Sequence, residues 1–561
     1  MTPLSFPALS EDYSDIIVRR QYLPSDPNKA FPEQIVNKQY SILYAPLSEA
    51  LATTSQIGYS SVPKLFTFQN TVSLETSGIL SVQAQPYLAL SGKDVLIGFL
   101  DSGIDYTHPA FRNSDGTTRI LGIWDQSDQN GTPPPGFLYG SSYSSEEINH
   151  ALFSSQPLSV IPESDEYGHG TAVAGIACGS ADTKADFIGA APESNLLFVC
   201  LKPAKAYLRT YFLIPESAVA YQENDLMLGV RYLMETARKL QRPLVICIAL
   251  GSNQGGHTGN TPLEDVLTAT EAVNGSYVVS GTGNEVGAAH HYSGKLSSAN
   301  ESIDIELLID RETSGVPVEF WSDSLSLYNI GFISPLGESI LPVYHGPVTF
   351  RTFPFLLENT KIEVYYTALE MLSGHQMALI RILNPTPGLW RLRITSQENS
   401  NGTFHLWLPI SGLVSPDIRF SSPDPDTTLT IPSCAEPILS SGTCNAADGS
   451  LFRASGRGYP RSGIVKPDFA TPGVSLTAPA PGGAYQGFTG SSAASALTAG
   501  SAALLAQWGH HRYPTRYLTA RELKNLFLRG TTQNPSYNYP NREWGYGTMN
   551  LMKIFKTFGR P

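Results

Sequence analysis

The stretch VLIGFLDSGIDYTHP, residues 95–109, decides the fold of this 561-residue chain. It begins as an apolar run and ends in Asp101 and a tight Ser-Gly turn. Short apolar runs of this kind are typical of parallel strands that are buried on both faces. Four of them occur along the chain: VLIGFL (95–100), NLLFVCL (195–201), PLVICIAL (243–250) and SYVVS (276–280).

A helical pattern lies between the second and third of these runs. In QENDLMLGVRYLMETARKL, residues 222–240, apolar residues recur at the spacing of one helix face. Strands that alternate with helices predict an α/β fold with a doubly wound, three-layer parallel sheet. Functional groups in such folds gather where the strands end.

Two segments do not show this alternation of strands and helices. Residues 1–75 mix strand-like and helical signals, including a strand at VPKLFTF (62–68), and predict a small α+β domain that is either a structural cap or a propeptide. Residues 299–425 consist of aromatic-rich, strand-like runs, which predict an inserted β-sandwich of jelly-roll character. The α/β domain would then be formed by residues 76–298 and 426–561.

The bulk composition is that of a globular protein with two or three structural units. The net charge of −12 argues against nucleic acid as a partner, because phosphate binding needs a basic surface. No run approaches the roughly 18–20 apolar residues of a membrane span. No secretory signal peptide is visible at the start of the chain. We therefore expect a soluble protein that binds neither nucleic acid nor a membrane.

Five cysteines are few and odd in number. Three of them lie in apolar runs, which favours buried, reduced thiols. Cys434 and Cys444 are close enough in the sequence to pair across a turn, so one disulfide stays open as the alternative.

Three polar residues stand at the ends of predicted elements. Asp101 ends a strand, His169 opens a small-residue helix in GHGTAVAG, and Ser492 opens an Ala-rich helix in TGSSAAS. A serine hydroxyl becomes an effective nucleophile when a histidine takes its proton, and a carboxylate holds that histidine in one tautomer. Each residue alone is equally explained as a turn former, a loop residue or a helix cap. Together they predict acyl-transfer chemistry.

The motifs DSGID, GHGTAVAG and TGSSAAS resemble, in the same order, the three signatures of the subtilisin-like (S8) serine peptidases. The resemblance implies a serine endopeptidase in which Asp101 orients His169, His169 is the general base and acid, and Ser492 is the nucleophile. Asn284, in VVSGTGNEV, corresponds to the side-chain donor of the oxyanion hole, beside the backbone N–H of Ser492. The alternative interpretation of Asn284 is a turn former after a strand.

The same resemblance points to the backbone that binds a substrate. IALGS (248–252) corresponds to the strand that pairs with an extended peptide, and SGTG (280–283) to a wall of the pocket for the residue before the cut. The substrate-binding residues that it implies are Ala249, Leu250, Gly251, Ser280, Gly281 and Gly283.

Longer matches within residues 85–555, such as GNEVGAAHHY and TPGLWRLRIT, resemble the Csp germination proteases of spore-forming Clostridia. That resemblance implies a cytoplasmic or spore-associated protease with a self-cleaved propeptide that stays bound, a jelly-roll insertion, and the zymogen of a spore cortex-lytic hydrolase as its substrate. The cut is expected between Gln69 and Gly78. Two alternatives stay open, a pseudoprotease that acts as a sensor or binding partner and a paralogue that degrades protein generally.

The sequence calls for no cofactor and no catalytic metal, because neither HExxH nor CxxC occurs. Asp105 and His108 lie near the first motif, but their spacing makes no metal site. His290 and His291 resemble a metal-binding pair, yet no acidic partner is expected beside them. No Asp-rich loop demands structural calcium.

Overall fold

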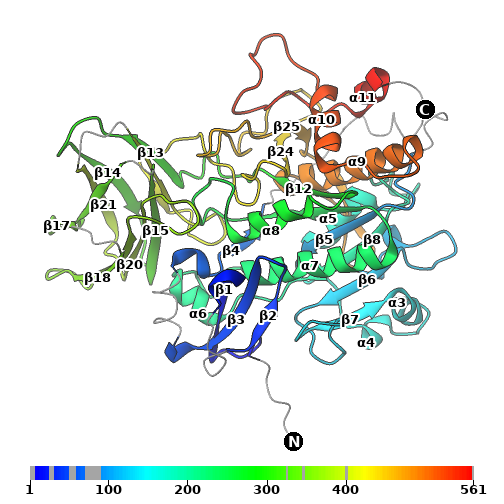
Figure 1. Ribbon diagram of the computed structural model, residues 1–561, viewed down its shortest axis with the longest axis horizontal. Coiled ribbons are helices and arrows are strands. Elements are labelled where there is room, and N and C mark those ends of the chain that lie inside the picture. Colours follow the sequence, from blue (N-terminus) through cyan, green and yellow to red (C-terminus); the bar gives the residue numbers. More distant parts are fainter. Residues whose placement is uncertain are drawn as a thin grey trace, which may run out of the picture.

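An eight-stranded sheet runs through the α/β body of the molecule (Figure 1). The computed structural model describes residues 7–23, 31–49, 58–69, 90–323, 326–343, 348–397 and 402–558. The strand order is β25-β24-β12-β10-β5-β8-β6-β7, and each neighbouring pair is parallel except β6 with β7. The strands are β5 (Leu96–Asp101), β6 (Ile120–Asp125), β7 (Ser141–Ser144), β8 (Asn195–Cys200), β10 (Leu244–Ile248), β12 (Ser276–Gly281), β24 (Leu439–Cys444) and β25 (Phe469–Pro472). The predicted α/β class is confirmed.

Helices cover both faces of this sheet because successive side chains of each buried strand point to opposite sides. Phe99 and Cys247 belong to a core shared with α5 and α9, whereas Leu100 and Ile246 belong to a core shared with α7 and α8. The helices are α3 (Ser145–Leu152), α4 (Pro157–Val160), α5 (His169–Cys178), α6 (Ala206–Tyr211), α7 (Glu223–Leu240), α8 (Pro262–Thr270), α9 (Ser491–Arg512), α10 (Ala520–Gly530) and α11 (Leu551–Phe558).

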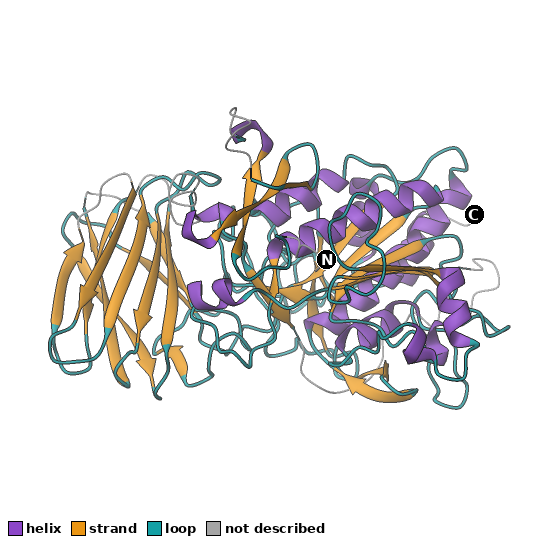
Figure 2. Ribbon diagram, turned by 90° about the horizontal axis from the view of Figure 1, so that it is seen from below, coloured by secondary structure: helices purple, strands orange, loops and turns teal. Residues whose placement is uncertain are grey.

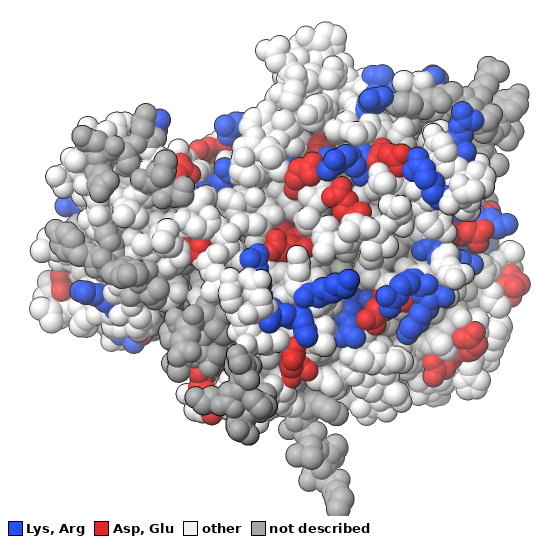
Figure 3. Space-filling view, viewed as in Figure 1, with Lys and Arg blue, Asp and Glu red and all other residues white. Residues whose placement is uncertain are grey.

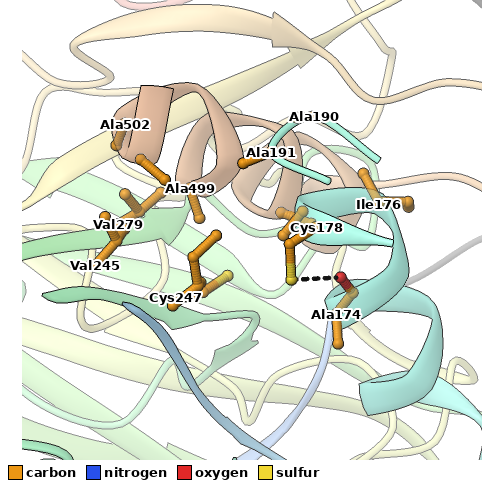
Figure 4. Packing of buried hydrophobic residues seen from close by; sticks show 14 of the residues in the cluster. Ala174, Ile176, Cys178, Ala190, Ala191, Val245, Cys247, Val279, Ala499 and Ala502 are labelled. Atoms are coloured by element: carbon orange, nitrogen blue, oxygen red, sulfur yellow. Dashed lines mark hydrogen bonds between the residues drawn. The ribbon is translucent and has the colours of Figure 1, made fainter. Parts of the chain in front are cut away.

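Small residues let α5 and α9 approach each other and the sheet. A Cβ added at Gly500 would lie 2.3 Å from the carbonyl oxygen of Ala177. Figure 4 shows Cys178 and Cys247 among the alanine and valine side chains of this packing. All five cysteines are buried and free, so the pairing of Cys434 with Cys444 left open above is wrong.

A β-sandwich forms the other end of the elongated molecule (Figure 2). Two antiparallel sheets enclose a separate apolar core, in the orders β13-β22-β15-β20-β19-β18 and β17-β16-β21-β14-β23. Its first strand begins before residue 299, the predicted start of the insertion. The strands are β13 (His291–Lys295), β14 (Ser302–Ile309), β15 (Gly315–Ser322), β16 (Tyr328–Ile333), β17 (Ser339–Val343), β18 (Val348–Pro354), β19 (Lys361–Thr367), β20 (Met377–Leu383), β21 (Gly388–Ser396), β22 (Thr403–Trp407) and β23 (Ile418–Phe420).

The N-terminal residues form a small sheet that docks on the α/β body (Figure 1). Two ion pairs hold it there, Asp15 with Lys205 at 2.7 Å and Arg19 with Asp265 at 2.8 Å. The predicted strand at 62–68 is present in part as β4, which pairs with β11 and β9 of the body rather than with the N-terminal sheet. The remaining elements are β1 (Tyr13–Arg19), β2 (Glu33–Ile35), β3 (Tyr40–Pro46), β4 (Leu65–Phe68), β9 (Tyr221–Gln222), β11 (Leu250–Gly251), β26 (Leu476–Ala480), β27 (Ala484–Phe488) and the short 3-10 helices η1 (Arg20–Tyr22), η3 (Tyr59–Ser61) and η4 (Pro109–Phe111).

Acidic and basic side chains lie next to one another over much of the face shown in Figure 3. Among the described residues, no helix combines the length and the apolar character that crossing a membrane requires.

Candidate active site

Three elements bring Asp101, His169 and Ser492 to the same edge of the sheet. Asp101 is the last residue of β5, His169 the first of α5, and Ser492 the second of α9. Glycines allow this approach: a Cβ at Gly170 would lie only 2.2 Å from the carbonyl oxygen of Gly103, in the turn after β5. Gly170 of GHG is therefore required by backbone contact, whereas Gly168 is favoured by its positive φ of 69° and Gly103 by the Glu163 side chain, which a Cβ there would meet at 2.3 Å.

The three side chains form one chain of hydrogen bonds. His169 Nδ1 lies 2.6 Å from Asp101 Oδ1, and His169 Nε2 lies 3.0 Å from Ser492 Oγ. Asp101 Oδ1 also accepts a hydrogen bond of 2.8 Å from the backbone N–H of Ser102. All three side chains are buried. The arrangement can pass a proton from the hydroxyl to an imidazole whose other nitrogen faces a fixed carboxylate.

A second carboxylate, which the sequence analysis missed, ties the turn after β5 to the start of α5. Asp165 Oδ1 accepts from the hydroxyl of Ser102 at 2.7 Å, and its Oδ2 accepts from the N–H and hydroxyl of Thr171 at 2.8 and 2.7 Å. Burial raises the pKa of Asp165. Asp165 thus holds together the two segments that carry Asp101 and His169.

A further buried acid, Glu163, also contacts this turn. Its Oε1 accepts from the backbone N–H groups of Ile104 and Asp165 at 3.0 and 2.9 Å. Burial, and then the nearby charge of Asp125, raise the pKa of Glu163 to about 8. The sequence does show a group of acidic residues just before His169, in PESDEYGHG (162–170), and this group could have drawn attention to Glu163 and Asp165. It does not show which of these acids is buried.

The raised pKa of Glu163 predicts a pH-dependent stability. Between the ordinary pKa of 4.5 and about 8, the folded chain keeps a proton that the unfolded chain has lost. The unfolding free energy therefore falls as pH rises, with a slope of up to about 1.4 kcal/mol per pH unit. Glu163→Gln, made in a Ser492→Ala chain, should reduce the slope in urea unfolding between pH 5 and 8 by this amount, while Glu264, whose pKa burial also raises to about 8, keeps its own contribution. Glu166→Gln, at an exposed position nearby, should leave the slope unchanged, and equal slopes in all three proteins would contradict the assignment.

Asn284 lies beside the N-terminus of α9. Its Oδ1 accepts from the N–H of Ser491 at 3.1 Å, and its Nδ2 is buried without a hydrogen-bond partner in the described part of the chain. The hydroxyl of Ser491 accepts from the N–H of Gly283 at 2.9 Å, which fixes the loop that carries Asn284. The free N–H groups of Nδ2 make this side chain a donor available to a ligand.

The chain's own N-terminal segment occupies this site. The carbonyl oxygen of Gln69 accepts from the N–H of Ser492 at 3.2 Å and from its hydroxyl at 3.0 Å. The same hydroxyl lies 3.0 Å from the carbonyl oxygen of Ala249. Phe68 is paired with Leu250 across the β4–β11 ladder. The segment that was expected to pair with an extended peptide thus pairs, in this structure, with the chain's own residues 67 and 68.

The side chain of Gln69 is buried and contacts the hydroxyl group of Thr430. Its Nε2 donates to Thr430 Oγ1 at 2.7 Å, a contact that the sequence analysis missed because Thr430 lies in no motif. A Cβ at Gly251 would come 1.8 Å from this Nε2, and one at Gly283 would come 2.4 Å from Thr430. Both glycines thus shape the pocket.

Two of the expected pocket residues, Ser280 and Gly281, lie at the end of β12. Ser280 is buried within β12, and a Cβ at Gly281 would lie 2.2 Å from Ser491 Oγ. Gly281 therefore permits the close packing of β12 against the start of α9, and the pocket glycine of the SGTG segment is the later one, Gly283.

An aromatic ring covers His169. Phe68 stacks on the imidazole with ring centroids 4.4 Å apart and also contacts Tyr167 and Tyr221. Phe488 contacts the imidazole at 5.5 Å. The histidine is therefore enclosed by apolar surface.

The histidines considered as metal ligands have hydrogen-bond partners of another kind. His290 Nδ1 lies 2.7 Å from Glu285 Oε2, so the expectation that no acidic residue lies beside it is wrong. His291 contacts His405 and a backbone carbonyl group, and His108 contacts the carbonyl oxygen of Ala484. Among the described residues, no group of three or more His, Cys, Asp or Glu side chains is placed to hold a metal ion.

Comparison with known proteins identifies one sequence family and finds similar solved structures. The family model described as "Subtilase family" matches residues 92–319 and 384–547. The structure of the Clostridium perfringens CspB protease is 31% identical, covers 86% of this chain and 97% of its own, and has a TM-score of 0.76. The prenylagaramide maturation protease PagA is 13% identical, covers 85% of this chain and 97% of its own, with a TM-score of 0.42. No curated protein sequence matches the chain.

Proposed function

Because the chain belongs to the subtilase family of serine endopeptidases, we propose that Asp101, His169 and Ser492 are its catalytic triad and that it cleaves itself between Gln69 and Asn70. The observation that carries this proposal is the position of the Gln69 carbonyl group, which accepts hydrogen bonds from both the N–H and the hydroxyl of Ser492.

The geometry supports the following reaction. Ser492 Oγ attacks the carbonyl carbon of Gln69 while His169 Nε2 takes its proton, and Asp101 stabilises the resulting imidazolium. The N–H of Ser492 and Nδ2 of Asn284 hold the oxyanion. His169 then gives the proton to the leaving nitrogen of Asn70. Water, activated by His169, hydrolyses the acyl-enzyme and restores Ser492.

We propose further that the cleaved N-terminal fragment stays bound. The pairing of β4 with β11 and β9 supports this, as do the buried ion pair of Asp15 with Lys205 and the pair of Arg19 with Asp265. The cut lies at the start of the predicted range, whose remaining residues, 70–78, lie outside the described part of the chain.

Mass spectrometry of the purified, denatured protein tests self-cleavage. The expected result is two fragments, of which the smaller ends at Gln69. A folded wild-type chain that remains intact would contradict the proposal. Labelling of Ser492 by a fluorophosphonate would then distinguish a protease that does not process itself from a pseudoprotease.

Asn284→Ala is expected to slow self-cleavage by about 100- to 1000-fold, because one of the two oxyanion donors is lost. The rate is measured as the appearance of the fragment ending at Gln69 after cell-free synthesis. Asn284→Asp is the matched control, since it keeps the Oδ1 acceptor for Ser491 but removes the Nδ2 donor. It should be as slow as the alanine variant, and wild-type rates in both would rule out an oxyanion role.

We propose, from the likeness to the Clostridium perfringens CspB protease and to Csp-like relatives, that the protein acts in spore germination on the zymogen of a cortex-lytic hydrolase. Deletion of the gene, followed by measurement of spore germination and zymogen processing, tests this role. Normal germination of the deletion strain would instead favour a general protein-degrading paralogue.

A further inference from the structure

The β-sandwich contributes to the cleft that holds residues 65–69. Side chains of β4 alternate in direction, as in any strand. Phe66 belongs to the core formed with α7, whereas Leu65 belongs to a buried cluster that includes Trp321 and Trp407 of the sandwich. One side of the bound peptide therefore faces the body of the molecule, and the other side faces the insertion.

The segment that follows β22, residues 408–414, covers the middle of the bound peptide, and we call it the roof segment. A Cβ at Gly412 would lie 3.6 Å from Cγ2 of Thr67, and Thr67 is only 4% exposed. Ile410 and Leu413 belong to the same buried cluster as Leu65. The roof segment thus closes the cleft over Thr67 and Leu65.

Hydrogen bonds fix the roof segment to the loops of the site. The N–H of Ser411 donates to Glu285 Oε1 at 3.1 Å, and Asn253 Nδ2 donates to Leu408 O at 3.3 Å and to Glu285 Oε2 at 3.0 Å. Glu285 directly follows Asn284, and its Oε2 also pairs with His290. A displacement of the roof would therefore break contacts beside the proposed oxyanion donor.

We propose that the roof segment of the inserted sandwich is a specificity element, which restricts the third residue before the cut to small side chains and selects an apolar residue at the fifth. This inference rests on the proposed function, in which Gln69 is the residue before the cut, Thr67 is the third and Leu65 the fifth. Because a Cβ at Gly412 would already be in van der Waals contact with Thr67 Cγ2, the space between the roof segment and the third residue has room for little more than one carbon atom. A much larger side chain at the third position would therefore clash with the roof segment, which is held in place by the anchored loops.

The second position before the cut is less enclosed than the third. Phe68 is half-buried, and the Tyr167 and Tyr221 rings that it contacts also line a cavity of about 330 Å³. The protein therefore takes extended protein segments that carry a small residue between two bulky apolar ones, shortly before the scissile bond.

Self-cleavage of the full-length chain tests the roof, because residues 65–69 are themselves the substrate. Time courses after cell-free synthesis are compared for a size series at the third position: Thr67→Ser, Thr67→Val, Thr67→Leu, Thr67→Phe and Thr67→Trp. Overpacking against a fixed backbone costs enough to slow the largest variants by about tenfold or more, with Ser and Val within about threefold of the wild type. Phe68→Trp, an enlargement at the neighbouring position, should lose at least about fivefold less than Thr67→Trp.

The same substitutions in a Ser492→Ala chain report folding through the thermal midpoint. The comparison extends to the largest variant that is still fully folded at the assay temperature in the Ser492→Ala chain. Two results would overturn the proposal for the roof segment. One is a self-cleavage rate that does not change from Thr67→Ser up to that variant, and the other is a loss of rate in that variant equal to the loss in Phe68→Trp. A wild-type chain that is not cleaved at all would instead contradict the proposed self-cleavage.

Discussion

Ser492→Ala is expected to leave the chain at full length, with no fragment ending at Gln69. The variant keeps the backbone N–H that donates to the Gln69 carbonyl group, so the N-terminal segment should remain in the site. It lacks the oxygen that attacks this carbonyl group. In subtilisin, loss of the nucleophile costs about 10⁶-fold in kcat, which would make cleavage undetectable over days.

Ser501→Ala is the matched control for this prediction. Ser501 lies on the same helix, is buried, and donates its hydroxyl to the carbonyl oxygen of Leu497 at 2.9 Å. Its loss should cost about 1 kcal/mol of stability and leave self-cleavage at the wild-type rate, since net hydrogen-bond contributions are of this size. A fragment ending at Gln69 in Ser492→Ala would assign the cut to another protease.

The meeting of Asp101, His169 and Ser492, our proposed triad, could be predicted because each residue lies in a short motif at the end of a recognisable element. Asp101 follows an apolar strand, and His169 and Ser492 each open a helix of small residues. The fold class followed from the same apolar runs. Local sequence was sufficient here because the carboxyl ends of parallel strands meet at one edge of the sheet.

The partners of the triad could not be predicted, because their roles depend on which distant segments meet. Glu163 comes close enough to the charge of Asp125 for its pKa to rise only when β6 lies in the same sheet as β5. Thr430 is identified as a pocket residue only by the Gln69 side chain that reaches it. Burial, rather than residue type, distinguishes these groups from ordinary surface residues.

The pairing partners of the strands could not be predicted from the sequence either. The strand at VPKLFTF was predicted, but not its pairing with β11 and β9, since an apolar run shows that a strand exists without showing its neighbour. The first strand of the sandwich, β13, was missed because HYSGK has almost no apolar pattern. It is held by its ladder with β22.

Asp101→Asn is expected to slow self-cleavage by about 10⁴-fold, as the corresponding change does in other Ser-His-Asp peptidases. Asp101 Oδ1 accepts from both His169 Nδ1 and the N–H of Ser102. An amide of the same shape can donate to Nδ1 instead, which places the proton of His169 on Nε2. That nitrogen then has no lone pair for the proton of Ser492, although every atom of the site keeps its place.

The unfolding midpoint distinguishes this chemical effect from damage to the fold. Asp101→Asn should unfold within a few degrees of an uncleaved Ser492→Ala chain, while the fragment ending at Gln69 appears only over very long incubation. Asp105→Asn is the matched control: Asp105 is buried in the same turn and accepts from the N–H groups of Thr107 and Gly482, but it makes no contact with His169. The hydrogen bonds of Asp105 join this loop to Gly482 in the β26–β27 hairpin and none of them reaches His169. The amide variant keeps only one acceptor and should lose about 1–3 kcal/mol of stability, but its cleavage rate should stay within about threefold of the wild type. Equal slowing in the two variants would mean that the turn, and not the tautomer of His169, limits the reaction.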